Sequence, residues 1–242
     1  MRAELERPHT PDGDPGAQAQ LCAGMRPSRR VRREAIATRT AFFDQQVLAA
    51  IDAAIGQVVI LGAGYDDRAL RFRSPGTRYF ELDHPATQRD KRRRLRRIGA
   101  DTRSLTLAPA DFRVDAPASV LAACGHDGSR PSLFICEGLL AYLDEGTTVD
   151  LLRSLRSCAA AGSRLAVSLA VHDAAASSNE VVSAANARRR HAGSEPWQTI
   201  LPVNEQLTLL ARAGWEVVSS RGSPQAAVRA QRAMLLVLAR PA

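Results

Sequence analysis

Short apolar runs alternate along this chain with longer stretches in which apolar residues recur every three or four positions. The run at residues 58–61 is β-branched at three of its four positions, which is typical of a strand buried on both faces of a parallel sheet. Similar runs predict further strands at 78–82, 105–108, 132–136, 164–170, 215–219 and 234–239. The alternation predicts one α/β domain with helices on both faces of its sheet.

Helices are expected where the helical spacing persists, over residues 28–55, 66–72, 86–98, 147–161, 179–190 and 203–212, with another beginning near 116. The polar segment 171–200 interrupts the alternation. We interpret it as a lid over a substrate pocket, because ligands of such folds approach the carboxyl ends of the strands. Residues 1–25 are rich in Pro, Gly, Asp and Ala and are expected to form a disordered tail, which leaves 26–242 as a single domain.

The first predicted strand ends in the glycine turn Gly62-Ala63-Gly64, and the second ends in Asp83. Missing side chains in the turn let a ligand approach the backbone closely. Strand, glycine turn, helix, strand and acid follow one another as in a nucleotide-binding βαβ unit, in which the acid binds ribose hydroxyls. A purely structural glycine turn is the alternative interpretation.

The residues after the turn indicate which nucleotide it could bind. The dinucleotide fingerprint has a third glycine, but Asp67 occupies that position here. Asp66 and Asp67 also stand at the expected helix start, where carboxylates would repel a pyrophosphate. A ligand with ribose and adenine but no phosphate, such as S-adenosylmethionine, therefore suits this turn better than a nicotinamide dinucleotide.

Several motifs carry a resemblance to a known family. The segments LGAGYDDRALRF, FELDHPATQRDKRRRL, FICEGLLAYL and SEPWQTILP resemble the leucine carboxyl methyltransferase family, in the family's order and from about Arg39 to the C-terminus. Within it, the chain is most similar to the bacterial branch of S-adenosylmethionine-dependent O-methyltransferases of polyketide and other secondary metabolism. The family turn commonly reads LGAGLDTR, so Tyr65 and Asp67 depart from it, whereas the matching positions are Gly62, Gly64, Asp66 and Arg68.

The resemblance implies a Rossmann-like class I methyltransferase fold, with a seven-stranded, mostly parallel sheet, an antiparallel last strand and a small helical lid. It implies S-adenosylmethionine as the cofactor. In the family, an arginine in the context of Arg39 reaches the carboxylate of the methionine moiety, a task that suits a guanidinium, although a surface arginine is the alternative. Asp111 and Phe112 would bind and enclose the adenine, unless Asp111 caps the helix expected near 116.

Glu137 and Gly138 follow the fourth predicted strand, beside the expected cofactor crevice. An acid there can hold the amino group of the methionine moiety and offset part of the sulfonium charge, or it can simply face water. His84 either touches the ligand or serves as a turn residue. The predicted cofactor-binding residues are thus Arg39, Gly62, Ala63, Gly64, Asp83, His84, Asp111, Phe112, Glu137 and Gly138.

The acceptor decides whether a catalytic base is needed. A carboxylate is already ionised at pH 7, whereas a phenol, an alcohol or a carbon nucleophile must lose a proton. His172, at the end of the fifth strand, is the first candidate for that base, and Tyr142 the second residue expected at the methyl-transfer site. Each has a structural alternative, a turn histidine and a packed aromatic. Basic groups near the lid, among them the run 188–190, favour an anionic acceptor, either a carboxylate or a diphosphate.

Charge and cysteine content limit other functions. The net charge of +8 would suit nucleic acid, but aromatic residues interleaved with the basic ones are missing, and we interpret the run 91–97 as a solvated helix face. The four cysteines are scattered without a CxxC pair, so a reducing cytoplasm is expected and a metal site is not. No run is long enough to span a membrane, and the polar N-terminus lacks the apolar segment of a signal peptide.

The sequence thus predicts a cytoplasmic S-adenosylmethionine-dependent methyltransferase that methylates an oxygen, carboxyl or hydroxyl, of a small anionic metabolite in secondary metabolism. Carbon methylation, for example of a prenyl diphosphate, is an open alternative, because the cofactor half says nothing about the acceptor atom. From other functional classes, a nicotinamide-dependent oxidoreductase and a nucleic-acid-binding protein remain as alternatives with weaker support.

Overall fold

The computed structural model describes residues 29–172, 177–190, 195–222 and 232–242. The tail expected at 1–25 lies outside them, and so do parts of the expected lid. All seven expected strands are present: β1 (Gln57–Leu61), β2 (Arg78–Asp83), β3 (Leu105–Pro109), β4 (Leu133–Cys136), β5 (Arg164–His172), β7 (Trp215–Gly222) and β8 (Arg232–Pro241). One short strand, β6 (Leu201–Pro202), was not expected, because two residues are too few to show a period.

The strands form one sheet in the order β3-β2-β1-β4-β5-β8-β7, and β6 pairs with β5 outside this path. β1 to β5 run parallel, whereas β8 is antiparallel to both β5 and β7. The predicted mostly parallel sheet with an antiparallel last strand is therefore confirmed, with β6 as an eighth strand. The strand order reverses at β1, between β2 and β4, which is where ligands of open α/β sheets bind.

Helices cover both faces of the sheet. They are α2 (Arg29–Asp52), α3 (Arg68–Arg71), α4 (Pro85–Arg97), α5 (Pro117–Ala123), α6 (Glu145–Ser157), α7 (Ser178–Arg190) and α8 (Val203–Arg212), with a 3₁₀ turn, η1 (Leu140–Tyr142). α3 is shorter than expected because Asp66 and Asp67 belong to the preceding turn. α6 begins two residues earlier than expected, since Asp144 caps it by accepting from the Thr147 amide.

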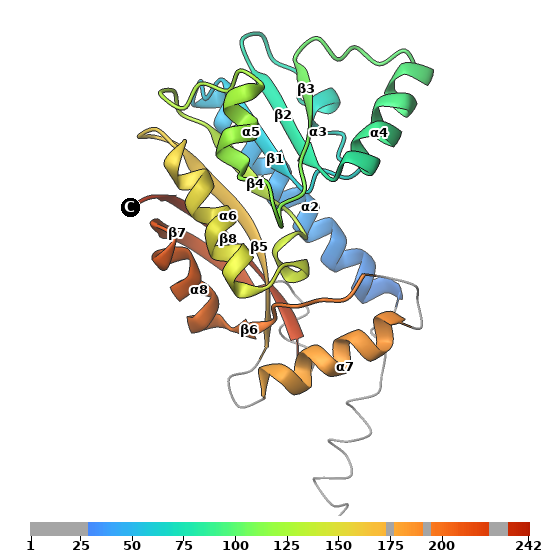
Figure 1. Ribbon diagram of the computed structural model, residues 1–242, viewed down its shortest axis with the longest axis vertical. Helices are drawn as coiled ribbons and strands as arrows, with labels where there is room; N and C mark the ends of the chain where they lie inside the picture. Colours follow the sequence, from blue (N-terminus) through green and yellow to red (C-terminus); the bar gives the residue numbers. More distant parts are fainter. Residues whose placement is uncertain (1–28, 173–176, 191–194, 223–231) are drawn as a thin grey trace, which may run out of the picture.

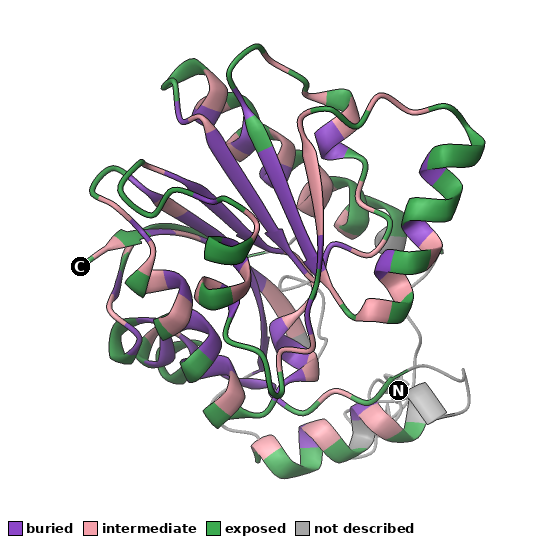
Figure 2. Cartoon of the chain, turned by 45° about the horizontal axis from the view of Figure 1, so that its top comes forward, coloured by how far each residue is buried: buried purple, intermediate pink, exposed green. Residues whose placement is uncertain are grey.

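Two apolar clusters hold the layers together. On one face, Phe80 and Leu82 of β2 share a cluster with α5, α6 and α8, which lie side by side in Figure 1. On the other, Tyr79 of the same strand packs with Phe43 of α2 and Ala69 of α3. This alternation along β2 is the period of a strand buried on both faces. In Figure 2 the central strands are accordingly buried, while the outer sides of the helices are exposed.

α7 packs at the end of β5 through a third, smaller cluster, in which Val181 and Ala185 contact Ala141 and Ala170. Asn186 of α7 exchanges two hydrogen bonds with the backbone of Trp197, both 2.7 Å long. The described part of the segment expected as a lid thus contains a helix, α7, which packs on η1 and β5. Among the described residues, no helix is long and apolar enough to cross a membrane.

The basic helix α4 does not conform fully to the expected solvated face. Most of its arginines are exposed, but Lys91 is 5% exposed and forms an ion pair with the fully buried Glu81 of β2. Lys91 is also the chain's only lysine. The interpretation of the whole run as solvated is therefore wrong at this residue, because α4 turns Lys91 towards the sheet.

Candidate functional site

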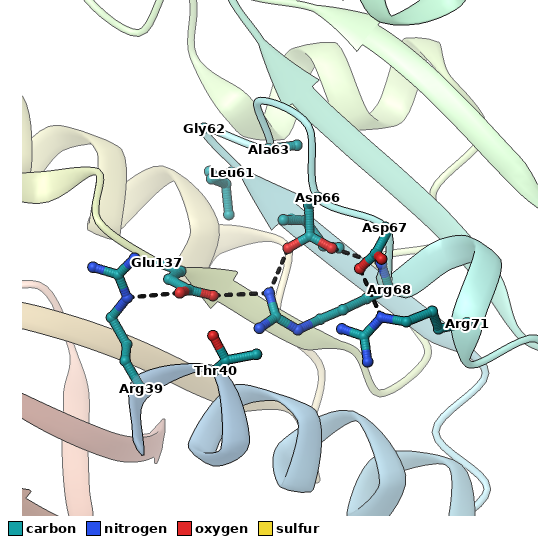
Figure 3. Close-up of a pocket in the computed structure, with 11 residues that line it drawn as sticks. Arg39, Thr40, Leu61, Gly62, Ala63, Asp66, Asp67, Arg68, Arg71 and Glu137 are labelled. Carbon is teal, nitrogen blue, oxygen red and sulfur yellow. Dashed lines mark hydrogen bonds and ion pairs between the residues drawn. The ribbon is translucent and has the colours of Figure 1, made fainter. Parts of the chain in front are cut away.

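A pocket of about 280 Å³ lies where β1, β4, α2 and α3 meet (Figure 3). Its walls combine apolar atoms from the end of β1 with three arginines and three carboxylates. The lining residues are Arg39, Thr40, Ile60, Leu61, Gly62, Ala63, Asp66, Asp67, Arg68, Arg71 and Glu137. The pocket therefore occupies the crevice beyond the carboxyl end of β1, at the reversal of strand order.

Gly62 lines the pocket, and Gly64 lies two residues further along the same turn. Gly62 has φ +62°, and a Cβ built there would stand 3.0 Å from Leu139 Cδ1, so both conformation and space require glycine. Gly64 has φ +48°, and a Cβ built there would meet no atom within 4 Å. The turn is thus packed behind Gly62 and open beside Gly64, where a ligand can approach the backbone.

Asp83 ties this turn to the end of β2. Its Oδ2 accepts from the Gly64 amide and its Oδ1 from the His84 amide, each at 2.7 Å. Each carboxylate oxygen has a second lone pair that remains suited to a ribose hydroxyl. The position expected for a ribose-binding acid is therefore next to the open side of the turn.

Arg39 and Glu137 meet on the opposite side of the pocket. Arg39 Nε donates to Glu137 Oε1 at 2.7 Å, and Figure 3 shows the guanidinium reaching from α2 to the end of β4. Gly138 is adjacent, since a Cβ there would lie 3.9 Å from Arg39 Nη1. The residues expected for the two ends of the methionine moiety are thus brought together.

Arg68 is a site residue that the sequence interpretation missed. Its side chain is 5% exposed and bridges three carboxylates, with Nε 2.7 Å from Asp44 and Nη1 paired with both Asp66 and Glu137. Burial lowers the pKa of Arg68, but Asp66, Glu137 and Asp44 together raise it more, so the pKa lies above its ordinary value. The sequence feature that could have identified Arg68 as a site residue was its match to the arginine of the family turn.

Asp111 and Phe112 follow β3, which pairs with β2 so that Asp83 lies opposite Pro109. The alternative that Asp111 caps the next helix is wrong, because Ala116 is the N-cap of α5 and receives no side-chain cap. Instead Arg113 binds the Asp111 carboxylate, at 2.6 Å from Nη2 to Oδ2, and lowers its pKa to about 2. The adenine role of both residues stays a prediction.

His84 caps α4, since its Nδ1 accepts from the Ala86 amide at 3.3 Å. The turn interpretation of His84 is thus sufficient to explain its position, and its contact with a ligand stays a prediction. Asp111 is a close enough neighbour that a charged His84 would help to lower the Asp111 pKa.

His172 and Tyr142 do not line the pocket. His172 ends β5 and is buried, with Nε2 2.8 Å from Ser178 Oγ at the start of α7. Tyr142 belongs to η1 and is half-buried; its carbonyl oxygen accepts from Gln198 Nε2 at 2.7 Å. His172 therefore lies at the start of the segment interpreted as a lid and Tyr142 beside that segment, and their catalytic roles stay predictions. The side chains of residues 188–190 lie outside the described part.

The residues present suit the chemical groups of S-adenosylmethionine. The open backbone at Gly64 and the Asp83 carboxylate suit ribose hydroxyls, and the Arg39 guanidinium and the Glu137 carboxylate suit a carboxylate and an ammonium. Their binding of these groups stays a prediction. Within the described ranges, no three His, Cys, Asp or Glu residues are grouped so that they could hold a metal ion.

The chain was compared with known families and proteins. The family model described as leucine carboxyl methyltransferase matches residues 5–156, so it begins earlier than the resemblance in the motifs and ends at α6. A Streptomyces coelicolor protein is 42% identical over 183 residues, covering 69% of this chain and 64% of that protein. A Mycolicibacterium paratuberculosis protein is 44% identical over 133 residues, covering 54% of this chain and 42% of that protein. Both are named "Putative S-adenosyl-L-methionine-dependent methyltransferase".

The chain thus spans between two fifths and two thirds of the length of these relatives. Among solved structures, a "putative methyltransferase" of Thermobifida fusca YX has a TM-score of 0.67 at 18% identity, covering 93% of this chain and 86% of that one. The mitomycin 7-O-methyltransferase MmcR has a TM-score of 0.55 at 19% identity, covering 78% of this chain and 50% of that one. At these identities the likeness shows the fold.

These comparisons confirm the predicted fold class, since the matching structures share the fold, and the relatives are named for S-adenosylmethionine, the predicted cofactor. They give no support to the nicotinamide or nucleic-acid alternatives. The family model covers more than half of the chain, and its match includes the glycine turn, Asp83 and Glu137. The chain belongs to the leucine carboxyl methyltransferase family.

Proposed function

We propose that this chain transfers a methyl group from S-adenosylmethionine to an oxygen of a small anionic metabolite in secondary metabolism. The observation that carries the proposal is the pocket itself, in which the glycine turn, Arg39 and Glu137 surround one space next to Asp83. The family name supports a carboxyl group as the acceptor, and the mitomycin 7-O-methyltransferase shows that an oxygen acceptor is compatible with this fold.

The charges of the pocket favour a cationic ligand of this kind. The three arginines and three carboxylates of the lining balance one another, and the carboxylate of Asp44, which does not line the pocket, pairs with two of these arginines. The ion-pair network therefore contains the guanidinium groups of Arg39, Arg68 and Arg71 and the carboxylates of Asp44, Asp66, Asp67 and Glu137. Three positive charges face four negative ones, so the network has one negative charge in excess. S-adenosylmethionine carries a sulfonium, an ammonium and a carboxylate, which sum to one positive charge. The ligand would therefore bring the network to neutrality.

The bound sulfonium supplies an electrophilic methyl group. The task of the chain is to hold the acceptor oxygen in line with the sulfur–methyl bond, and such alignment alone can lower a barrier by about 7–11 kcal/mol. When a carboxylate attacks, the new oxygen–carbon bond forms as the sulfur–carbon bond breaks, the electron pair stays on sulfur, and no proton moves. This reaction needs no general base.

A hydroxyl or carbon acceptor would require proton removal. His172 is then our candidate base and Tyr142 a residue of the acceptor site, with α7 as the lid, because His172 is bonded to Ser178 at the start of α7 and the Tyr142 carbonyl to Gln198, which follows α7 in the chain. Carbon methylation of a small anion such as a prenyl diphosphate remains the alternative.

The test combines binding with product chemistry. Calorimetry should show micromolar binding of S-adenosylmethionine and no heat with NADH. The protein is then incubated with S-adenosylmethionine and with matched carboxylic acids, phenols and prenyl diphosphates, and S-adenosylhomocysteine is measured. A methylated product that mild alkali hydrolyses is an ester, whereas an ether or a carbon-methylated product resists. Turnover only with alkali-resistant products would exclude the carboxyl acceptor, and absence of S-adenosylmethionine binding to the folded protein would exclude the function.

We also propose that the protein works in a reducing compartment such as the cytoplasm. The described cysteines, Cys124, Cys136 and Cys158, are all free thiols. Burial raises the pKa of the Cys136 thiol to about 12, so this thiol is inert at neutral pH. A reduced and an oxidised preparation should therefore have the same thermal unfolding midpoint.

A further inference from the structure

Lys91 connects the basic helix α4 to the backbone of the cofactor site. Its Nζ donates to the carbonyl oxygen of Asp66 at 2.6 Å and pairs with the carboxylate of Glu81. Asp66 belongs to the turn segment, residues 62–67, that separates β1 from α3. A single buried ammonium thus contacts β2 and the turn segment at once.

This ammonium and its partner carboxylate are buried. Glu81 is fully buried, and among the described residues no donor forms a well-directed hydrogen bond to either of its carboxylate oxygens. The ion pair with Lys91 is therefore the main compensation for a buried charge. Gln88 of α4 binds the Glu81 backbone, and the other charged groups that face Glu81 are Asp66 and Asp83.

Asp66, whose carbonyl oxygen accepts from Lys91, is itself linked to further residues of the site. The Asp66 carboxylate pairs with Arg68, and Arg68 in turn pairs with Glu137 at 2.8 Å. A second tie runs parallel to it, since Tyr65 Oη donates to Asp90 of α4 at 2.7 Å, but Tyr65 is 60% exposed. Arg94 of α4 also lies over the Tyr65 ring, 4.9 Å from its centroid. Of these contacts between α4 and the turn segment, the buried one is made by Lys91.

We propose that Lys91 is a positioning residue, whose bond to the Asp66 carbonyl holds the turn segment, and through Asp66 and Arg68 also Glu137, in the geometry that receives the cofactor. The effect on cofactor affinity rests on the function proposed above. The effect on the turn segment does not, because it is a property of the chain without ligand. Lys91 does not line the pocket and takes no part in the transfer itself.

A variant in which both Lys91 and Glu81 are replaced by uncharged residues distinguishes the positioning role of Lys91 from its role in neutralising Glu81. Lys91→Met leaves Glu81 buried without a partner and should lower the thermal unfolding midpoint. The double variant Glu81→Leu/Lys91→Met removes both charges and should recover much of that loss, because apolar residues can replace a buried ion pair without net cost. It still lacks the donor to the Asp66 carbonyl. Glu81→Gln is the converse control, since it removes the charge pair but retains that donor.

The readout is amide hydrogen exchange of the ligand-free protein at Ala63, Gly64 and Asp66, whose amides are hydrogen-bonded to Leu82, Asp83 and Ala63. We expect exchange about tenfold faster in Lys91→Met and in the double variant, and unchanged in Glu81→Gln and in Arg96→Met, an exposed position on the same helix. Amides of β5 should be unchanged in the double variant.

If the turn segment of the double variant exchanges its amide hydrogens at the same rate as in the wild type, the proposal is overturned, because Lys91 would then only neutralise Glu81. Faster exchange in Glu81→Gln than in the wild type would overturn it as well, since the ion pair rather than the bond to Asp66 would hold the turn. Calorimetry with S-adenosylmethionine should give about tenfold weaker binding for the double variant and unchanged binding for Glu81→Gln. If the wild-type protein binds no S-adenosylmethionine, the proposed function fails while the exchange result still decides the role of Lys91.

Discussion

Arg39 on α2 and Glu137 at the end of β4 are 98 residues apart in the sequence and are joined by a 2.7 Å hydrogen bond from Nε to Oε1. The guanidinium is one-third exposed and the carboxylate 15% exposed, so the pair faces the pocket rather than the core. An amino acid carries the complementary charges, a carboxylate for the arginine and an ammonium for the glutamate. Under the proposed function, this pair would bind the amino-acid end of the cofactor.

Arg39→Ala should weaken S-adenosylmethionine binding at least tenfold, because a charged hydrogen bond to the ligand carboxylate is lost. Binding of methylthioadenosine, which lacks the amino acid, should change less than about twofold. Calorimetry with both ligands measures the difference. Equal weakening of the two ligands would place Arg39 outside the methionine subsite.

Asp83→Ala should weaken both ligands, at least tenfold each, since the ribose is common to them. The carboxylate also accepts from the Gly64 amide, so part of the loss comes from a looser turn. Asp83→Asn retains an acceptor for that amide and separates the two contributions. Unchanged affinity of Asp83→Ala for methylthioadenosine would contradict the ribose assignment.

The sequence predicted the glycine turn, Asp83 and Glu137 because each follows an apolar run, and parallel strands end at one edge of the sheet. Arg68 and Lys91 were not predicted, for a physical reason. α3 has four residues, too few to show the periodicity of a helix in the sequence. Two of the three partners of Arg68, Asp44 and Glu137, are 24 and 69 residues away along the chain. Lys91 stands in a run of arginines of the same charge, and only the packing of α4 on β2 distinguishes it.

Arg68→Met should destabilise the protein by about 3–5 kcal/mol, because it leaves three partly buried carboxylates without their shared cation. Burial already raises the pKa of Asp66, so the loss of the cation should raise it further. Arg71→Met is the matched control on the same helix. Arg71 also pairs with Asp44, but its side chain is 38% exposed, so the expected cost is at most about 1 kcal/mol.

Urea unfolding monitored by circular dichroism measures both free energies of unfolding. Comparable losses for Arg68→Met and Arg71→Met would mean that burial does not distinguish the two arginines. A loss below about 1 kcal/mol for Arg68→Met would contradict its role as the shared partner of Asp44, Asp66 and Glu137.

Glu81 should make the stability of the protein depend on pH. Burial, opposed by Lys91 and assisted by the nearby Asp66 and Asp83, raises the pKa of Glu81 to about 7 from its ordinary 4.5. Between these two values the folded protein binds more protons than the unfolded chain. The free energy of unfolding contributed by Glu81 therefore falls as the pH rises through this window, by up to about 3 kcal/mol.

Glu81→Gln cannot titrate, so the difference in the free energy of unfolding between it and the wild type isolates this contribution from the other carboxylates. Measured by urea unfolding at about pH 4.5 and about pH 8, the wild type should lose stability relative to Glu81→Gln on going to the higher pH. A constant difference would mean that Lys91 and burial balance, so that the pKa of Glu81 is the same in the folded and the unfolded chain. A gain of the wild type at high pH would mean that Lys91 outweighs burial and that the folded pKa of Glu81 lies below its ordinary value, because only a lowered pKa makes an acid more stabilising once it is ionised.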